Sequence, residues 1–337
     1  MKAYEIGAQD GISALTEVAR PDPVAGPGEA VLKVRLVGLN NRDVQVIEGR
    51  YGAKKAAERV PTSEGVGEVV ALGEGATGIA VGDRAVFAHF ATWIDGAFAM
   101  SAFGHDVGIT HDGWLAEYVK VPASALVRVP EGLSDEQAAP LASAAVTAWN
   151  AVVAVGQVKP GDLVLALGTG GVAIWTLQIA KAHGAQVAIT SSSDEKLDLA
   201  RKLGADFTVN YAEHPDWAAE LLRQTGGRGA DIIAETGGQG TLPLSINAAA
   251  ANGRIVLIAV GSADGPLPNY GGIIGKNLVI KGITEGSRAM LAGLVDCIAA
   301  NGIKPVIDRT FPFDEARDAY AYLKSGGHVG KVLIKLD

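Results

Sequence analysis

The chain has 337 residues, of which 48% are hydrophobic, 44 are glycine and 6% are aromatic. This composition favours a two-domain α/β protein with many tight strand–helix joints and argues against a disordered chain. The net charge of −8, without a basic cluster, argues against a nucleic-acid partner. We find no run that suggests a membrane span and no apolar core typical of a signal peptide, so a cytoplasmic protein is expected.

The cysteine count argues against two kinds of site. Cys297 is the single cysteine of the sequence, so neither an intrachain disulfide nor a zinc site made of cysteines can form. The six histidines include no pair spaced four residues apart. A histidine metal site would therefore need residues that are distant in the sequence.

The N-terminal part of the chain alternates short strand-like runs with glycine turns. These runs are 30–39, 65–75, 82–88 and 114–122. Short strands at this spacing predict a small β-barrel or sandwich.

From about residue 130 the pattern changes to strands that alternate with helices. Ser134 and Gln137 have the spacing of a capping box at the start of a helix. Six apolar runs with helical segments between them predict a parallel, doubly wound sheet. The runs are 163–167, 186–190, 207–210, 230–235, 254–260 and 277–283.

A glycine turn, ALGTGGVA at 166–173, lies at the end of the first of these runs and leads into a long apolar helix. Gly168 permits a tight turn, Gly170 lets a pyrophosphate approach the backbone, and Ala173 lets the helix pack closely. The first amides of the helix then point at the anion. This context predicts a dinucleotide site rather than a plain bend. The residues expected to hold the dinucleotide are Gly168, Gly170, Gly171 and Val172.

The end of the second run indicates which dinucleotide the turn holds. Ser191 is expected to meet the adenosine ribose and has no charge to repel a 2′-phosphate. Lys196 offers a positive charge, whereas Asp194 and Glu195 oppose a phosphate. Together these residues favour NADP(H) over NAD(H). Ser192 and Glu195 also have the spacing of a capping box for the next helix.

Several segments together resemble the medium-chain dehydrogenase/reductase superfamily, in particular its zinc-independent quinone-oxidoreductase-like branch. The resemblance extends nearly from end to end, with its marks at 38–51, 60–75, 81–87, 140–152, 168–185 and 328–334. It implies a GroES-like catalytic domain, a β-barrel made of residues 1–127 and 287–337. It also implies a Rossmann domain of residues 128–286, with the active site in the cleft between the two domains.

The resemblance also implies a site without zinc. In the zinc-dependent alcohol dehydrogenases of this superfamily, a cysteine, a histidine and a further cysteine or acid hold the catalytic metal. The matching positions in this sequence are Asn40, Ser63 and Ser143, and none of these is a good zinc ligand. Glu64 and Asp43 remain nearby, but two carboxylates without imidazole do not make a tetrahedral zinc site.

Catalytic roles follow from the same resemblance. Asn40 and Asp43 match a metal-free N-x-x-D pattern, in which the Asn40 amide would donate to a substrate carbonyl. Tyr51 matches a tyrosine that faces the nicotinamide and would orient the substrate or donate a proton. The alternatives are that Asn40 caps a turn and that Tyr51 packs at a domain edge.

Further cofactor contacts are implied by position alone. Thr147 matches a threonine near the nicotinamide ribose, and Val260 matches the backbone that meets the carboxamide. Tyr211 matches an aromatic residue beside the adenosine. Lys331 is expected to reach the pyrophosphate, and its alternative is a solvated surface lysine.

One segment, 87–114, departs from the compact quinone reductases and concentrates aromatic residues. Phe90, Trp93 and Phe98 would form either an apolar lid over the substrate or a loop that packs on the barrel or on a partner. His89, His105 and His111 are expected to be loop residues rather than ligands.

The expected function is reduction of a conjugated carbonyl (a quinone, enone or enoyl compound) with hydride from NADPH. Amide and hydroxyl donors can stabilise the resulting enolate without a Lewis acid. The alternative is a zinc-free NAD(P)-dependent alcohol dehydrogenase or aldehyde or ketone reductase. Loss of zinc would weaken catalysis more in that case, because direct carbonyl reduction builds charge on one oxygen. A third possibility is a non-catalytic NADPH-binding protein. We expect a homodimer that covers the apolar sheet edge near 254–260 and 277–283.

Overall fold

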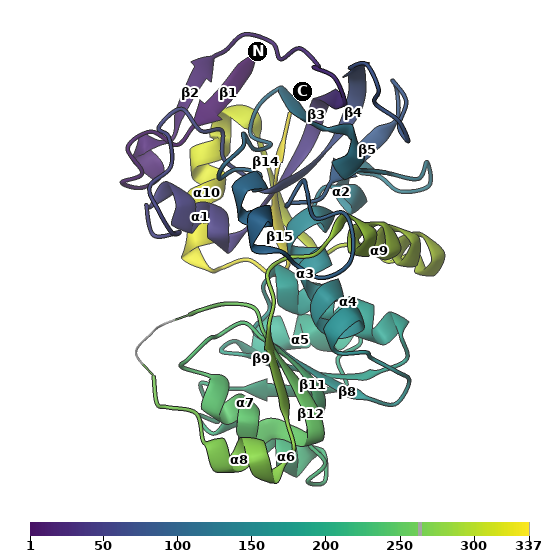
Figure 1. Ribbon diagram of the computed structural model, residues 1–337. Helices are drawn as coiled ribbons and strands as arrows, with labels where there is room; N and C mark the ends of the chain where they lie inside the picture. The colour runs from purple at the N-terminus through teal and green to yellow at the C-terminus, as the bar shows by residue number, and fades with distance from the viewer. Residues whose placement is uncertain (262–264, 337) are drawn as a thin grey trace. The chain divides into compact units, whose positions relative to one another are not determined.

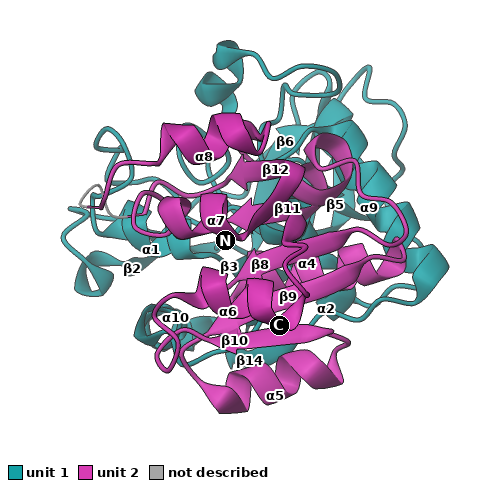
Figure 2. Ribbon diagram, turned by 90° about the horizontal axis from the view of Figure 1, so that it is seen from below, with its two compact units in different colours: residues 1–146, 286–337 teal, residues 147–285 magenta. Residues whose placement is uncertain are grey.

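The computed structural model describes residues 1–261 and 265–336. The chain divides into two compact units, which Figure 2 shows in different colours. Unit 1 consists of residues 1–146 and 286–337, and unit 2 of residues 147–285.

Unit 1 is the predicted β-rich domain. Its strands pair antiparallel except β14 and β15, which are parallel. Its seven-stranded sheet has the order β14-β15-β3-β4-β5-β7, and β6 pairs with β3. The helix α10 packs beside α1 on this unit (Figure 1). The strands of unit 1 are β1 (Lys2–Glu5), β2 (Thr16–Ala19), β3 (Glu29–Leu39), β4 (Glu64–Leu72), β5 (Arg84–Phe87), β6 (Tyr118–Pro122), β7 (Leu126–Arg128), β14 (Ile307–Pro312) and β15 (Lys331–Lys335). Its helices are α1 (Asn41–Ile47), α2 (Asp135–Ala138), α9 (Arg288–Asn301) and α10 (Ala316–Ser325).

The core of unit 1 is formed by buried residues of its strands and loops together with those of α1 and α10. Trp114 is fully buried and stacks on Phe87, with 4.4 Å between the ring centroids. The indole also lies against Gly65, where a Cβ atom would come within 2.8 Å of it. Gly65 is therefore needed so that β4 can pass close to the indole ring.

Unit 2 is the predicted parallel sheet, with strand order β10-β9-β8-β11-β12-β13. All of its pairs are parallel, and the order is that of a dinucleotide-binding Rossmann fold. Its strands are β8 (Leu163–Leu167), β9 (Gln186–Ser191), β10 (Phe207–Asn210), β11 (Ala230–Glu235), β12 (Ala249–Leu257) and β13 (Val279–Gly282). Its helices are α4 (Gly171–Ala182), α5 (Asp194–Lys202), α6 (Trp217–Gln224), α7 (Leu242–Ala248) and α8 (Tyr270–Gly275), and α3 (Val146–Trp149) lies at the boundary between the units.

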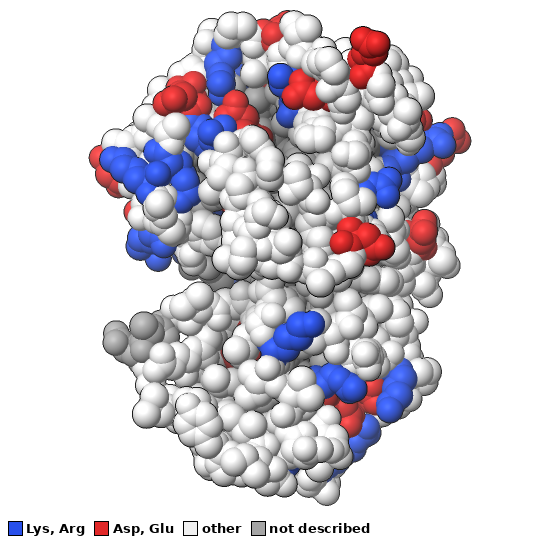
Figure 3. Space-filling view, in the orientation of Figure 1, with Lys and Arg blue, Asp and Glu red and all other residues white. Residues whose placement is uncertain are grey.

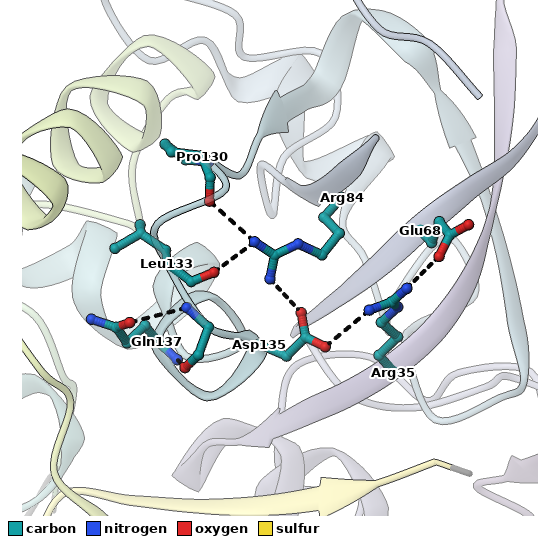
Figure 4. A network of polar contacts seen from close by, with 8 residues as sticks. Arg35, Glu68, Arg84, Pro130, Leu133, Asp135 and Gln137 are labelled. Carbon is teal, nitrogen blue, oxygen red and sulfur yellow. Dashed lines mark hydrogen bonds and ion pairs between the residues drawn. The ribbon is translucent and has the colours of Figure 1, made fainter. Parts of the chain in front are cut away.

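A polar network places the boundary between the units later than the predicted 127/128 (Figure 4). Asp135 accepts from Arg84 Nη1 at 2.8 Å and from Arg35 Nη1 at 3.4 Å. Arg84 also donates to two carbonyl oxygens of the loop before α2, those of Pro130 and Leu133. These contacts attach the start of the helical segment to the β-strands of unit 1.

The same helical segment corrects the expectation about membrane spans. Residues Asp135–Val155 form a helical run of 21 residues with a window of mean hydropathy 1.5, which passes a length and composition test for a span. Of that window, 78% is buried inside the structure. A buried core helix passes the same test, so this run is weak evidence for a membrane segment. The predicted capping box at Ser134 and Gln137 is confirmed at its start.

The segment 87–114 packs on unit 1 itself. Phe90 is 2% exposed and Trp93 is 7% exposed, and both rings contact Phe98. The amide of Arg288 at the start of α9 donates to the Trp93 carbonyl at 2.9 Å. Of the two interpretations of this segment, these contacts favour the packing loop.

Charged side chains of both signs occur on the face drawn in Figure 3. That view shows no uniformly basic face. It gives no support for a nucleic-acid partner.

Candidate active site

The predicted glycine turn follows β8 in unit 2. Gly168 has a φ of +79°, a left-handed conformation that L side chains rarely adopt. Gly170 is the N-cap of α4, and its carbonyl accepts from the Ile174 amide at 3.0 Å. A Cβ atom at either glycine would meet no protein atom within 4 Å. The backbone thus leaves open space at the N-terminus of α4, where Gly171 and Val172 begin the helix, and this suits a pyrophosphate.

The predicted ribose end lies where β9 and β10 finish. Ser191 pairs in register with Asn210, a residue that the sequence analysis missed. Asn210 Nδ2 donates to Asp194 Oδ1 at 3.0 Å, so this carboxylate is held toward β10. Tyr211 follows Asn210 and is 43% exposed. The signal available in the sequence was Asn210 itself, a polar residue at the end of the third predicted strand of unit 2.

The helix cap in this region was predicted one residue too early. Ser193, not Ser192, is the N-cap of α5, and its hydroxyl accepts from the Lys196 amide at 3.4 Å. The Ser193 amide donates to Ser191 Oγ at 3.3 Å. Lys196 therefore lies in the first turn of α5, half-buried, close in the chain to the end of β9.

Two other predicted cofactor residues differ in exposure. Thr147 is 5% exposed, and its hydroxyl donates to Glu285 Oε2 at 3.0 Å. Val260 is 84% exposed and follows β12. The Val260 carbonyl lies so close to Gly238 that a Cβ atom there would come within 2.1 Å of it. Their roles toward a nicotinamide stay predictions.

Unit 1 contains a buried polar cluster where α1 begins. Asn40 is the N-cap of α1, and its backbone N–H donates to Asp43 Oδ2 at 2.8 Å. Asn40 Nδ2 lies 3.2 Å from Ser63 Oγ and 3.0 Å from Glu64 Oε1. Asn40 is half-buried, whereas Asp43, Ser63 and Glu64 are buried. The capping alternative for Asn40 is thus present alongside any catalytic role.

Lys331 belongs to this cluster, which contradicts the alternative of a solvated surface lysine. Its side chain is 3% exposed, and Nζ lies 2.6 Å from Glu64 Oε1. It also donates to the Leu39 carbonyl and to Asn40 Oδ1, each at 2.6 Å. Lys331 is therefore not a surface lysine, because its ammonium is used inside unit 1. Its contact with a pyrophosphate stays a prediction.

Glu64 joins three distant parts of the chain. Its Oε2 accepts from the Ser143 amide at 2.8 Å and from the Ala144 amide at 3.3 Å. Its Oε1 faces Lys331 and Asn40. Asn40 and Ser143, which match zinc-ligand positions only through the family resemblance, thus both contact the buried carboxylate of Glu64. Ser63, the third such position, contacts Asn40.

Burial raises the pKa of Asp43 to about 6, because desolvation of the carboxylate outweighs its favourable contacts. The positive charges of Arg42 and Lys331 and the hydrogen bond from the backbone N–H of Asn40 lower this pKa. The negative charge of Glu64 raises it. Asp43 Oδ2 also lies 3.5 Å from Ser63 Oγ. The carboxyl can therefore hold or release a proton near neutral pH.

Arg42, His89 and Tyr51 form a second group that the sequence analysis did not assemble. Arg42 Nη1 lies 2.9 Å from His89 Nδ1, and the Arg42 guanidinium lies 5.0 Å from the centre of the Tyr51 ring. Burial and Arg42 together lower the pKa of His89 well below its usual range, so the imidazole is neutral at pH 7. The sequence signal was Arg42 between Asn40 and Asp43.

The side chains of the cluster do not fit a zinc ion. The positions that match zinc ligands carry an amide and two hydroxyls, and the Lys331 ammonium already occupies Asn40 Oδ1. Zinc takes thiolate, imidazole or carboxylate ligands. Across residues 1–261 and 265–336, no group of three or more His, Cys, Asp or Glu side chains is placed to hold a metal ion.

Comparison with known proteins places this fold and site in a family. Residues 26–131 match the alcohol dehydrogenase GroES-like domain, and residues 171–300 match the family described as zinc-binding dehydrogenase. A zinc-type alcohol dehydrogenase-like protein of Schizosaccharomyces pombe is 44% identical over 317 residues, which is 92% of each chain. The chain belongs to the medium-chain dehydrogenase/reductase superfamily, and it is an NAD(P)-dependent oxidoreductase of that superfamily.

Further relatives differ in their described activities. An acryloyl-coenzyme A reductase of Metallosphaera sedula is 30% identical, over 93% of this chain and 94% of the relative. A putative alcohol dehydrogenase of Sinorhizobium meliloti has a TM-score of 0.92 and 38% identity, covering 99% of this chain and 98% of that one. A mycobacterial protein solved with NADPH has a TM-score of 0.82 and 27% identity, covering all of both chains.

Proposed function

We propose that the protein is a zinc-independent, NADP(H)-dependent reductase of a conjugated carbonyl compound. The observation that carries this proposal is the donor chemistry at the three zinc-ligand positions, which are Asn40, Ser63 and Ser143. When bound, the nicotinamide supplies a hydride to the carbon β to the carbonyl. The chain must then stabilise the enolate oxygen and provide a proton.

The half-buried polar side chains of unit 1 are the candidates for this work. Asn40, Arg42 and Tyr51 are partly exposed, whereas Asp43, Ser63 and Glu64 behind them are buried. The two hydrogens of Asn40 Nδ2 already face Glu64 and Ser63. The donors proposed for an enolate oxygen are therefore the Arg42 guanidinium and the Tyr51 phenol. The acryloyl-coenzyme A reductase relative, at 30% identity, acts on a substrate of this chemical class.

The preference for NADP(H) is also a proposal. Ser191 carries no charge, Asp194 is held by Asn210, and Lys196 lies in the first turn of α5. A lysine ammonium there would make a charge-assisted contact with a 2′-phosphate. The relative solved with NADPH supports this proposal at 27% identity.

The second candidate function is oxidation of an alcohol or reduction of an aldehyde or ketone. The zinc-type alcohol dehydrogenase-like relative, at 44% identity, favours it. Negative charge then develops on one oxygen rather than over an enolate, so the site would need stronger donors than an amide. The two functions differ in the acceptor that they reduce.

The test is NADPH oxidation with a quinone, an enone, an enoyl thioester and an aldehyde, each with and without a strong chelator. We expect turnover with at least one conjugated acceptor, faster than with the aldehyde and unchanged by the chelator. Loss of activity on chelation, restored by one zinc ion per chain, would overturn the zinc-independent proposal. Faster turnover with the aldehyde would favour the second function.

A matched pair of variants locates the activity. Tyr51→Phe removes a phenol in the candidate site, and Tyr118→Phe removes one on β6, outside that site. We expect Tyr51→Phe to lower kcat by about tenfold or more, whereas Tyr118→Phe leaves it unchanged. An unchanged kcat in Tyr51→Phe would remove Tyr51 from the proposed mechanism.

We also propose that the protein is a homodimer that pairs through the edge strand β13 of unit 2. Val279 on this strand is 51% exposed, and the nearby apolar side chains of Leu267, Tyr270 and Ile274 are 69–81% exposed. An open apolar sheet edge is an aggregation hazard that a two-fold partner covers. Light scattering at micromolar concentration should give twice the chain mass, and a monomer would refute the proposal.

A further inference from the structure

Lys331 is buried inside unit 1, and its environment is complete. Its ammonium has three hydrogens, and three oxygens lie 2.6 Å from Nζ: the Leu39 carbonyl, Asn40 Oδ1 and Glu64 Oε1. Each hydrogen therefore has one acceptor. A buried cation with all of its donors used is fixed in place far more firmly than a surface lysine.

This cation selects one orientation of the Asn40 amide. A carboxamide can be turned so that its oxygen and nitrogen exchange places. In the observed orientation, Oδ1 faces the ammonium and Nδ2 faces Glu64 Oε1 at 3.0 Å and Ser63 Oγ at 3.2 Å. The reverse orientation would place the NH₂ group against the ammonium and the oxygen against the carboxylate. Both of those contacts are repulsive, so Lys331 and Glu64 together exclude it.

We propose that Lys331 is a positioning residue, whose charge fixes the orientation of the Asn40 side-chain amide. Asn40 occupies one of the three positions that match zinc ligands. A single internal cation thus organises the site in place of a metal ion. Lys331 does not touch the substrate in this proposal. Its kinetic consequence rests on the proposed reductase function, whereas its effect on the Asn40 amide does not.

The experiment uses a double variant, because Lys331→Met alone leaves Glu64 buried without its cation and can fail to fold. Lys331→Met/Glu64→Gln removes both charges of the pair. Glu64→Gln alone and Lys331→Arg, which keeps the charge, accompany it. The matched control is Lys335→Met, the same substitution at an exposed position of the same strand, β15.

We expect the double variant to fold and to bind NADPH within about twofold of the original chain, because the three hydrogens of the Lys331 ammonium already have acceptors inside unit 1. Its kcat should fall by about tenfold to a hundredfold, because Asn40 begins the helix α1 that carries Arg42, and a displaced donor slows the reaction. Lys331→Arg should recover part of this loss, and Lys335→Met should match the original chain. A kcat equal to that of the original chain would show that the pair is merely structural, and tenfold weaker NADPH binding would return Lys331 to the cofactor site.

A second measurement needs neither activity nor a variant that folds. In the original chain labelled with ¹⁵N-asparagine, the Asn40 side-chain hydrogens should exchange with solvent at least about tenfold more slowly than those of exposed Asn301. Asn40→Asp identifies the resonance. Equal exchange rates would overturn the positioning role. Slow exchange together with no reductase activity would instead contradict only the proposed function.

Discussion

Two fully buried glutamates, one in each unit, are satisfied in different ways. Glu64 of unit 1 faces the ammonium of Lys331, the Asn40 amide and the backbone amides of residues 143 and 144. Glu235 of unit 2 accepts from the amides of Gly237 and Gly238 and from the hydroxyls of Thr241 and Ser245. Both have no exposed surface.

The difference lies in the range of the contacts and in the charge of the partners. The partners of Glu235 lie within ten residues along the chain, so this carboxylate shapes one local turn after β11. The partners of Glu64 come from three distant segments and include a buried cation. Glu64 therefore holds a tertiary site together, and removing it also leaves a buried charge without a partner.

The largest expected effect sharpens this comparison directly. Glu64→Gln should lower the free energy of unfolding by about 3–5 kcal/mol, because Lys331 loses the carboxylate that compensates its charge. Glu235→Gln should cost about 1–3 kcal/mol, because the donors that it leaves are uncharged. Urea unfolding of both variants beside the original chain measures the two losses. Equal losses would mean that the buried charge of Lys331 adds nothing to the difference.

The same contrast explains which features the sequence could predict. The strands of unit 2 and the turn at Gly168 follow from hydrophobic runs and glycines that are adjacent in the sequence. Ser134 and Gln137 likewise form the predicted cap. A one-residue error occurred at Ser193, where several serines in a row offered the same cap.

The site of unit 1 depended on pairing between distant segments, which periodicity does not encode. The predicted role of Lys331 at the pyrophosphate came from its position in the family, and the sequence analysis did not foresee that the pairing of β15 with β3 brings it beside Leu39 and Asn40. His89 likewise lies beside Arg42, although the two are 47 residues apart in the chain. Such contacts depend on how distant segments pair, which the local sequence pattern does not specify.

The next prediction concerns the pH dependence of stability that Asp43 causes, a carboxyl on which the charge of Glu64 acts. The pKa of Asp43 is raised to about 6 in the folded chain by burial, against about 3.9 in an unfolded chain. The stability that this carboxyl contributes is thus fully present below pH 4 and is lost as the pH rises through 6. Asp43→Asn cannot ionise, so relative to the original chain it should gain up to about 3 kcal/mol between pH 4 and pH 8.

Chemical unfolding of both chains at pH 4.5, 6 and 8 measures this gain. The groups whose charges act on Asp43 are Arg42 and Lys331, which lower its pKa, and Glu64, which raises it. Asp198→Asn, at an exposed position of α5, is the matched control and should show no such trend. A gap that stays constant over this range would show that Asp43 titrates at its ordinary pH.

A third prediction concerns cofactor binding by unit 2. It tests whether residues close together in the chain recognise the 2′-phosphate, just as residues close in the chain surround Glu235. Lys196→Ala should weaken NADPH binding by about tenfold to a hundredfold and leave NADH binding nearly unchanged, because a charge-assisted contact to the 2′-phosphate is lost. Ser191→Asp should reverse the preference, because it places a carboxylate near that phosphate. Fluorescence titration with both cofactors measures the effects. Tighter NADH binding by the original chain would contradict the assignment and point to Asp194 as the ribose partner.

The smallest expected effect comes from a buried polar group that, unlike the two glutamates, lacks a hydrogen bond. Tyr320 on α10 is fully buried, and its hydroxyl has no hydrogen-bond partner among the residues that the structure describes. Burial also raises the pKa of this phenol well above its usual range. Tyr320→Phe removes the hydroxyl and keeps the ring, so it should stabilise the chain by about 1 kcal/mol, the low end of the cost of an unsatisfied buried group.

Tyr4→Phe is the matched control, because the Tyr4 hydroxyl donates to the Asp314 carbonyl at 3.3 Å, and it should be neutral or destabilising. Thermal unfolding of the two variants compares them, and a loss of stability in Tyr320→Phe would show that this hydroxyl has a partner such as an ordered water.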